Sequence, residues 1–113
     1  MNHLERDPTV VLDRIGELAQ EIGQHPPLIG ASSPQLDQAL EEVKWLQIKA
    51  VWFKGEGYSL ERINYLRRHL QALAGDGHGH SRQNQLQMAL SEVGRLRMWM
   101  RPENASEASK GIH

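Results

Sequence analysis

The chain has no cysteine, so it can form no disulfide and offers no thiolate for catalysis or metal binding. It also has no apolar run near the roughly 20 residues that a membrane-spanning helix needs. Its first ten residues, MNHLERDPTV, lack the apolar core of a signal peptide. We therefore expect a cytoplasmic protein that does not insert into a membrane.

Residue patterns that carry catalysis are missing as well. The sequence has no Glu-x-x-His or His-Glu-x-x-His motif, which helical metal centres use, and no grouping of serine, histidine and aspartate. Glu41, Glu42 and Glu92 have no histidine at a ligand spacing, so we expect them on the solvated surface. These absences predict a protein that is not an enzyme and has no cofactor.

What the sequence does contain is four segments in which apolar residues recur at helical spacing. Asp7-Pro8 and Ser33-Pro34 each place a capping residue before a proline, which is typical of a helix start, and Ser59 is the expected cap of the third helix. Short turns rich in glycine separate the later segments, so sequential helices should be antiparallel. We predict an all-α antiparallel four-helix bundle over residues 1–101 and a flexible polar tail over residues 102–113. The predicted helices span residues 8–23, 34–54, 59–74 and 81–101.

Two of the predicted helices resemble each other at an offset of 50 residues. Residues 35–46 and 85–96 are identical at seven of twelve positions. The apolar positions of the first and third helices also match, at an offset of 48. Either the chain is a duplicated helical hairpin or the likeness reflects the shared composition of amphipathic helices. A duplication would predict a bundle with a pseudo-two-fold axis.

The segment 34–54 is apolar on two opposite sides. Leu36, Leu46 and Phe53 mark the side that completes a core, whereas Trp45, Ile48 and Trp52 lie on the other side. This second stripe is either an interaction surface or a part of the core that the first helix covers. An exposed apolar patch usually marks an interface, and two-fold dimers are the commonest oligomers, so we expect a protein partner or a homodimer. The predicted partner-binding residues are Trp45, Ile48, Trp52, Met98 and Trp99.

Charge is divided unevenly along the chain. Residues 1–42 carry a net charge of −6 and residues 43–101 carry +6, while the whole chain carries −1. Packing of the acidic first helix against the basic third or fourth helix would explain this, as would head-to-tail association of copies. Alternatively, the basic part binds a nucleotide or a nucleic acid. The candidate anion-binding residues are Lys54, Arg62, Arg67, Arg68, Arg95, Arg97 and Arg101.

Residues 62–99 loosely resemble the helical hairpin of phage proteins that sequester cyclic nucleotide signals. The features in common are a helix, a short polar turn, Ser81-Arg82, and a second helix that ends near a tryptophan. The spacing from Ser81 to Trp99 departs from the pattern of that family, and the chain is not assigned to it. The resemblance adds a ligand-sequestering role to the alternatives.

The densest polar cluster is Asp76, His78 and His80. A His-x-His pair with a carboxylate can bind Zn²⁺ or Ni²⁺, which need several nitrogen or oxygen ligands. Spacing brings only two histidines together, so a plain polar loop is the favoured interpretation and the metal loop is the third alternative. The sequence as a whole favours a small helical adaptor, inhibitor or regulator that binds a protein or self-associates.

Overall fold

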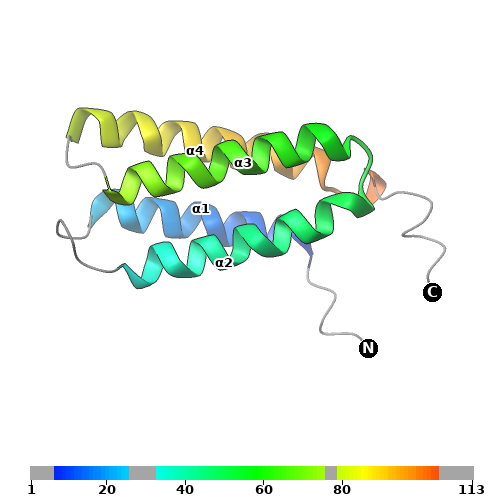
Figure 1. Cartoon of the computed structure of the whole chain (residues 1–113), viewed down its shortest axis with the longest axis horizontal. Coiled ribbons are helices and arrows are strands. Elements are labelled where there is room, and N and C mark those ends of the chain that lie inside the picture. Colours follow the sequence, from blue (N-terminus) through cyan, green and yellow to red (C-terminus); the bar gives the residue numbers. More distant parts are fainter. Residues whose placement is uncertain (1–6, 26–32, 76–78, 105–113) are drawn as a thin grey trace.

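The computed structural model describes residues 7–25, 33–75 and 79–104, and it is an all-α antiparallel four-helix bundle (Figure 1). This confirms the predicted fold class. Two short 3₁₀ turns follow the second and fourth helices. The elements are α1 (Pro8–Gln24), α2 (Pro34–Lys49), η1 (Ala50–Trp52), α3 (Glu56–Gly75), α4 (Gly79–Trp99) and η2 (Pro102–Asn104).

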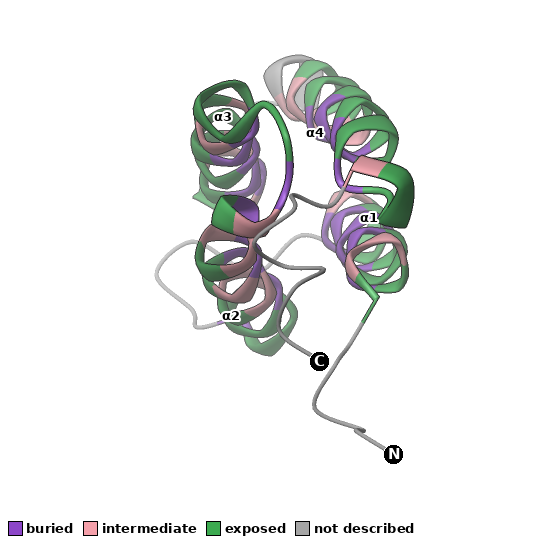
Figure 2. Cartoon of the chain, turned by 90° about the vertical axis from the view of Figure 1, so that its right-hand side faces the viewer, coloured by how far each residue is buried: buried purple, intermediate pink, exposed green. Residues whose placement is uncertain are grey.

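Seen from one end, the helices occupy the corners of a square and turn their buried faces toward its centre (Figure 2). Each helix packs on the two helices beside it, so α1 lies between α2 and α4, and α3 is diagonally opposite α1. One apolar stripe from each helix fills the centre. The largest fully buried side chains are Leu12, Ile15, Leu18, Ile22, Leu46, Ile63, Leu66, Leu70, Leu73, Leu96, Met100 and Val11.

The first two helices begin as the sequence predicts. The Asp7 side chain accepts a hydrogen bond from the backbone N–H of Thr9 at 2.9 Å, and the Ser33 hydroxyl accepts one from Leu36 at 3.1 Å. A proline follows each cap, where its missing N–H costs no helical hydrogen bond. Each cap accepts a hydrogen bond from a backbone N–H group that has no acceptor within its own helix.

The link between α2 and α3 corrects two predictions. The α-helix ends at Lys49 and not at 54, and α3 begins at Glu56, three residues earlier than expected. The chain leaves the helical path at Phe53, whose backbone is extended with φ −124° and ψ 151°. Gly55, whose φ of 74° lies in the left-handed region, completes the change of direction just before α3 begins. Ser59 is therefore no cap; it lies buried in the first turn of α3, and its N–H donates to the Gly55 carbonyl at 2.9 Å.

The predicted flexible tail begins too early at residue 102. Residues 102–104 form η2, and Asn104 fixes this turn to the end of the bundle. Its carbonyl accepts a hydrogen bond from the Lys54 N–H at 2.8 Å, and its side-chain amide donates to the Met98 carbonyl at 3.0 Å. Residues 105–113 lie outside the described part of the chain.

Burial follows the proposed repeat. Ala39 and Ala89 are both buried, and so are Val43 with Val93 and Leu46 with Leu96 at the same offset of 50. Glu42 and Glu92, which are also paired by the offset, differ, because Glu92 alone is buried. The two helices that carry these pairs, α2 and α4, are diagonally opposite, which is where a pseudo-two-fold axis would place them. The arrangement agrees with a duplicated hairpin, which itself stays a prediction.

Gly55 is the position in the link that tolerates a side chain least. A Cβ atom there would lie 2.9 Å from Cε3 and Cζ3 of Trp99, and a left-handed φ costs other residues about 1–3 kcal/mol. We expect Gly55→Ala to lower the free energy of unfolding by at least about 2 kcal/mol in a urea titration.

Gly94→Ala is the matched control, because Gly94 lies within α4 and no atom lies within 4 Å of the position of its Cβ. Alanine should raise the free energy of unfolding there by up to about 1 kcal/mol. Equal effects of the two substitutions would contradict the role given to Gly55.

Candidate functional site

The outer face of α2 and η1 exposes two large aliphatic side chains. Ile48 is 67% exposed and Val51 is 51% exposed. Beside them, Trp45 and Trp52 are half-buried and pack against the core, and the Lys49 ammonium lies 5.8 Å from the centre of the Trp45 ring. The second stripe is thus neither wholly a surface nor wholly core. The two tryptophans of this stripe pack against the core, and the two aliphatic side chains are exposed to solvent.

The other two predicted partner-binding residues lie elsewhere. Met98 is 63% exposed near the end of α4, the helix diagonally opposite α2. Trp99 follows it and packs against Gly55, with its ring 5.1 Å from the ring of Tyr58. Trp99 therefore closes the end of the bundle, although 40% of it remains exposed. The predicted set of five residues is divided between two surfaces.

A cluster of charges lies between α3 and α4. The carboxylate of Glu92 accepts from Nη1 of Arg62 at 3.1 and 3.4 Å and from Nη1 of Arg95 at 3.3 Å. Glu92 is buried, with 5% of its surface exposed, and the Arg62 side chain is 20% exposed. The expectation of a solvated Glu92 was therefore wrong, and Arg62 is largely withdrawn from the exposed side of α3.

Sequence reasoning missed this ion cluster because its two helices are 30 positions apart at the contact. One signal was present. Glu92 follows Ala89 by three positions and precedes Leu96 by four, so it falls on the apolar stripe of its own helix. An acid on such a stripe needs a cation from a neighbouring helix if it is to stay charged.

Aromatic rings hold the Arg62 guanidinium in place. Its Cζ atom lies 5.5 Å from the centre of the Tyr58 ring and 4.6 Å from that of Tyr65, distances typical of cation–π contacts. Its Nε atom is buried and has no hydrogen-bond partner. Arg62 is therefore fixed by its carboxylate and its two rings, whereas half of the Arg95 side chain is exposed.

A groove of about 390 Å³ runs over this cluster. His69 lies in its wall, and its Nδ1 is 2.8 Å from the side-chain oxygen of Gln85 on α4. A second hollow of about 380 Å³ lies on the neighbouring face of α3 and shares Tyr65 with the first. The groove is lined by Arg62, Tyr65, His69, Gln87, Met88, Ser91, Glu92 and Arg95. The second hollow is lined by Gly57, Leu60, Glu61, Asn64, Tyr65 and Arg68.

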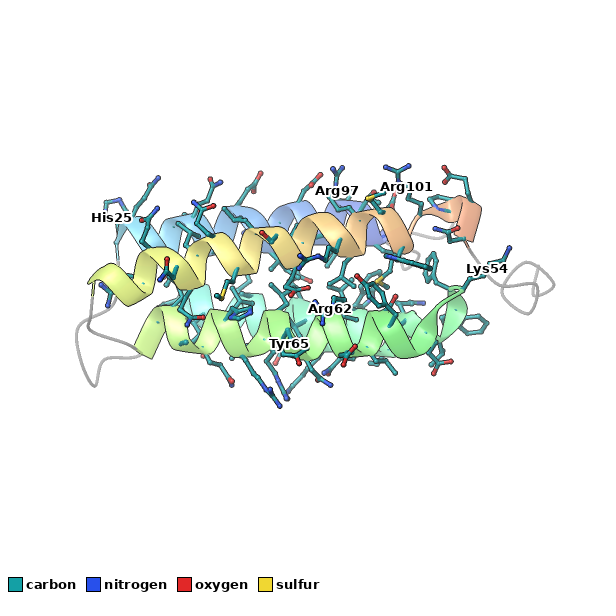
Figure 3. The ribbon with its side chains drawn as sticks, turned by 90° about the horizontal axis from the view of Figure 1, so that it is seen from above. His25, Lys54, Arg62, Tyr65, Arg97 and Arg101 are labelled. Atoms are coloured by element: carbon teal, nitrogen blue, oxygen red, sulfur yellow. The ribbon has the colours of Figure 1, made fainter. Side chains whose placement is uncertain are left out.

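The remaining predicted anion-binding residues do not gather into one site. Arg97 pairs with Asp13 of α1 at 3.0 Å. Figure 3 shows Arg62 in the seam between α3 and α4, Arg97 and Arg101 directed away from that seam, and Lys54 at the end of the bundle. Arg67 and Arg68 are exposed on α3. The structure thus brings Arg62 and Arg95 together and leaves the other five dispersed.

The candidate metal residues cannot be placed. Asp76 and His78, together with the side chain of His80, lie outside the part of the chain that the structure describes. Among the described residues, no group of three or more histidine, aspartate or glutamate side chains could hold a metal ion. The metal-loop interpretation therefore stays an untested alternative.

Comparison with protein-family models, with curated proteins and with solved structures finds no match to this chain. Within residues 7–25, 33–75 and 79–104, no helix is both long enough and apolar enough to cross a bilayer. The surfaces of the bundle therefore carry the functional argument.

Removing the buried charge should destabilise the bundle. Glu92→Gln leaves the largely buried Arg62 with only the exposed Glu61 carboxylate, 3.9 Å from its Nη2, as a counter-ion. We expect the free energy of unfolding to fall by about 1–3 kcal/mol. Glu17→Gln is the control, because Glu17 and its partner Arg14 are exposed and 3.8 Å apart; its effect should stay below about 0.5 kcal/mol. Chemical denaturation of both variants measures the difference, and similar values would show that the Glu92 cluster has no structural role.

Proposed function

We propose that the chain is a small non-enzymatic interaction protein that pairs with a second copy of itself through the outer face of α2. The exposure of Ile48 and Val51 on one face, beside the half-buried Trp45 and Trp52, carries this proposal. Burying a large aliphatic side chain is worth about 1.5–3 kcal/mol, which a partner surface would recover. A contiguous apolar face of this kind is typical of an interface.

The charges of α2 favour a second copy in antiparallel orientation. Asp37 and Glu41 lie in the first half of the helix, whereas Lys44, Lys49 and Lys54 follow in the second half and beyond it. When two such helices run in opposite directions about their basic ends, the acidic first halves lie on either side of the contact and away from each other. A parallel pair would place like charges together, which is unfavourable.

A two-fold axis near Ile48 gives a self-complementary register. In an antiparallel helix pair the numbers of facing residues have a constant sum, so Ile48 would face Ile48 of the second copy and Trp45 would face Val51 in η1. The contact of Trp45 with Val51 then occurs twice, as two-fold symmetry requires. A dimer of this kind suits an adaptor, an inhibitor or a regulator, which holds partners and converts no substrate.

Binding of a nucleotide or nucleic acid has less support. Arg62 and Arg95 share Glu92, and Arg97 pairs with Asp13, so three of the seven candidate cations already have an acidic partner. Strong binding to a phosphate backbone needs several cations along one path. The dispersed positions of the remaining four provide no such path among the described residues.

The α2 face is best tested through its exposed side chains. Ile48→Lys with Val51→Lys places like charges across the two-fold axis, and we expect the dimer to dissociate into monomers by light scattering over a concentration series. Because both side chains are exposed, the free energy of unfolding of the monomer should change by no more than about 0.5 kcal/mol per site. Trp45 and Trp52 are unsuitable for this test, since their loss would also disturb the core.

Val10→Lys with Met88→Lys is the matched control. Both side chains are large, apolar and exposed, at 63% and 48%, and both lie on other helices. The control should dimerise like the native chain. A native chain that stays monomeric at every concentration, or an α2 variant that still dimerises, would refute the proposed interface.

A further inference from the structure

The layer formed by α3 and α4 carries a second surface, which is basic, whereas the α2 face is apolar. The helices α3 and α4 together contain six arginines and three acidic residues. The helices α1 and α2 together contain six acidic and three basic residues. The two hairpins form opposite layers of the bundle (Figure 2). The charge division seen along the sequence is therefore a division in space, and the groove over Glu92 lies in the basic layer.

We propose that this groove is a docking site for an acidic segment of a partner protein, with Arg95 as the residue that binds its carboxylate. Arg62 and Arg95 share the Glu92 carboxylate, and Arg62 also has the Glu61 carboxylate 3.9 Å from its Nη2. Arg95 is therefore the guanidinium in the groove that has no carboxylate to itself among the described residues. Arg95 uses Nη1 for Glu92, and within the described residues its Nε and Nη2 remain as donors. A planar guanidinium with two such donors matches the geometry of a carboxylate.

The walls of the groove fit a protein segment. Tyr65 and Met88 are 36% and 48% exposed, and tyrosine, methionine and arginine are the side chains enriched at protein interfaces. Arg68, whose Cζ atom lies 5.6 Å from the centre of the Tyr65 ring, supplies a cation for a second carboxylate along the segment. Arg62 does not need to move, because Tyr58, Tyr65 and Glu92 already hold it.

The charge of the site also favours a carboxylate ligand over a phosphate ligand. A carboxylate carries one negative charge, which matches the one guanidinium, Arg95, that the groove offers to a ligand. A phosphate monoester carries close to two at neutral pH, and the second charge would face the nearby Glu92 carboxylate. The groove thus favours an acidic peptide over a nucleotide.

Fluorescence anisotropy with a labelled hexaglutamate peptide tests the site, with hexaglutamine as the uncharged comparison. We expect the native chain to bind hexaglutamate alone, with an affinity that falls as salt rises. Arg95→Gln should weaken binding about 10-fold, because it removes a charge-assisted hydrogen bond. Met88→Glu should weaken it as well, because it adds a negative charge to the groove wall.

Arg67→Gln is the matched control, since it removes the same charge from α3 at an exposed position that lines neither hollow. It should weaken binding less than about 2-fold. Equal losses for Arg95→Gln and Arg67→Gln would overturn the proposal, as would tighter binding of ATP or of single-stranded DNA than of hexaglutamate. Circular dichroism of each variant confirms that it is folded.

The experiment also separates this site from the α2 interface. Ile48→Lys with Val51→Lys should abolish dimerisation and leave peptide binding intact. A dimer that survives in that variant but is lost in Arg95→Gln would show that the acidic layer of a second copy occupies the groove. That result would overturn both this proposal and the proposed function.

Discussion

The bundle depends on one constraint, which is that each of its four helices has an apolar stripe that must be buried against the other helices. Most of the stability of a helix within a protein comes from packing of its apolar face, so packing of the stripes holds the bundle together. Leu12, Leu46, Ile63 and Leu96, one from each helix, are fully buried together. Among the described residues Glu92 is the one buried charged side chain, and α3 supplies its counter-ion.

The apolar periodicity was enough to predict the four helices and the core, because burial in a bundle repeats with the helix itself. It could not predict where α2 ends, since Ala50, Trp52 and Phe53 continue the apolar pattern through the 3₁₀ turn and past it. It could not predict the state of Glu92 either. The spacing places Glu92 beside the core, but the ion pair depends on the register of α3 against α4, which no local pattern contains.

The two hairpins share a core pattern and differ on their surfaces. At the offset of 50, the half-buried Trp45 of α2 corresponds to the charged Arg95 of α4, although the neighbouring Val43 and Val93 are both buried. The core positions of both helices are constrained because their side chains pack in the same centre of the bundle. The outer positions are free of that constraint, so one half can carry an apolar face and the other an ionic groove.

The side chains of the two proposed binding surfaces are held in place by the bundle itself. Trp45 and Trp52 belong to the core on one side and to the α2 face on the other, so they fix the face whether or not a second copy is bound. The Glu92 cluster does the same for the α3–α4 groove, because it holds Arg62 before any ligand arrives. Preorganised side chains lose little further conformational freedom on association. The proposed dimer face and the proposed peptide groove lie in opposite layers of the bundle, so occupation of one would not require the other to rearrange.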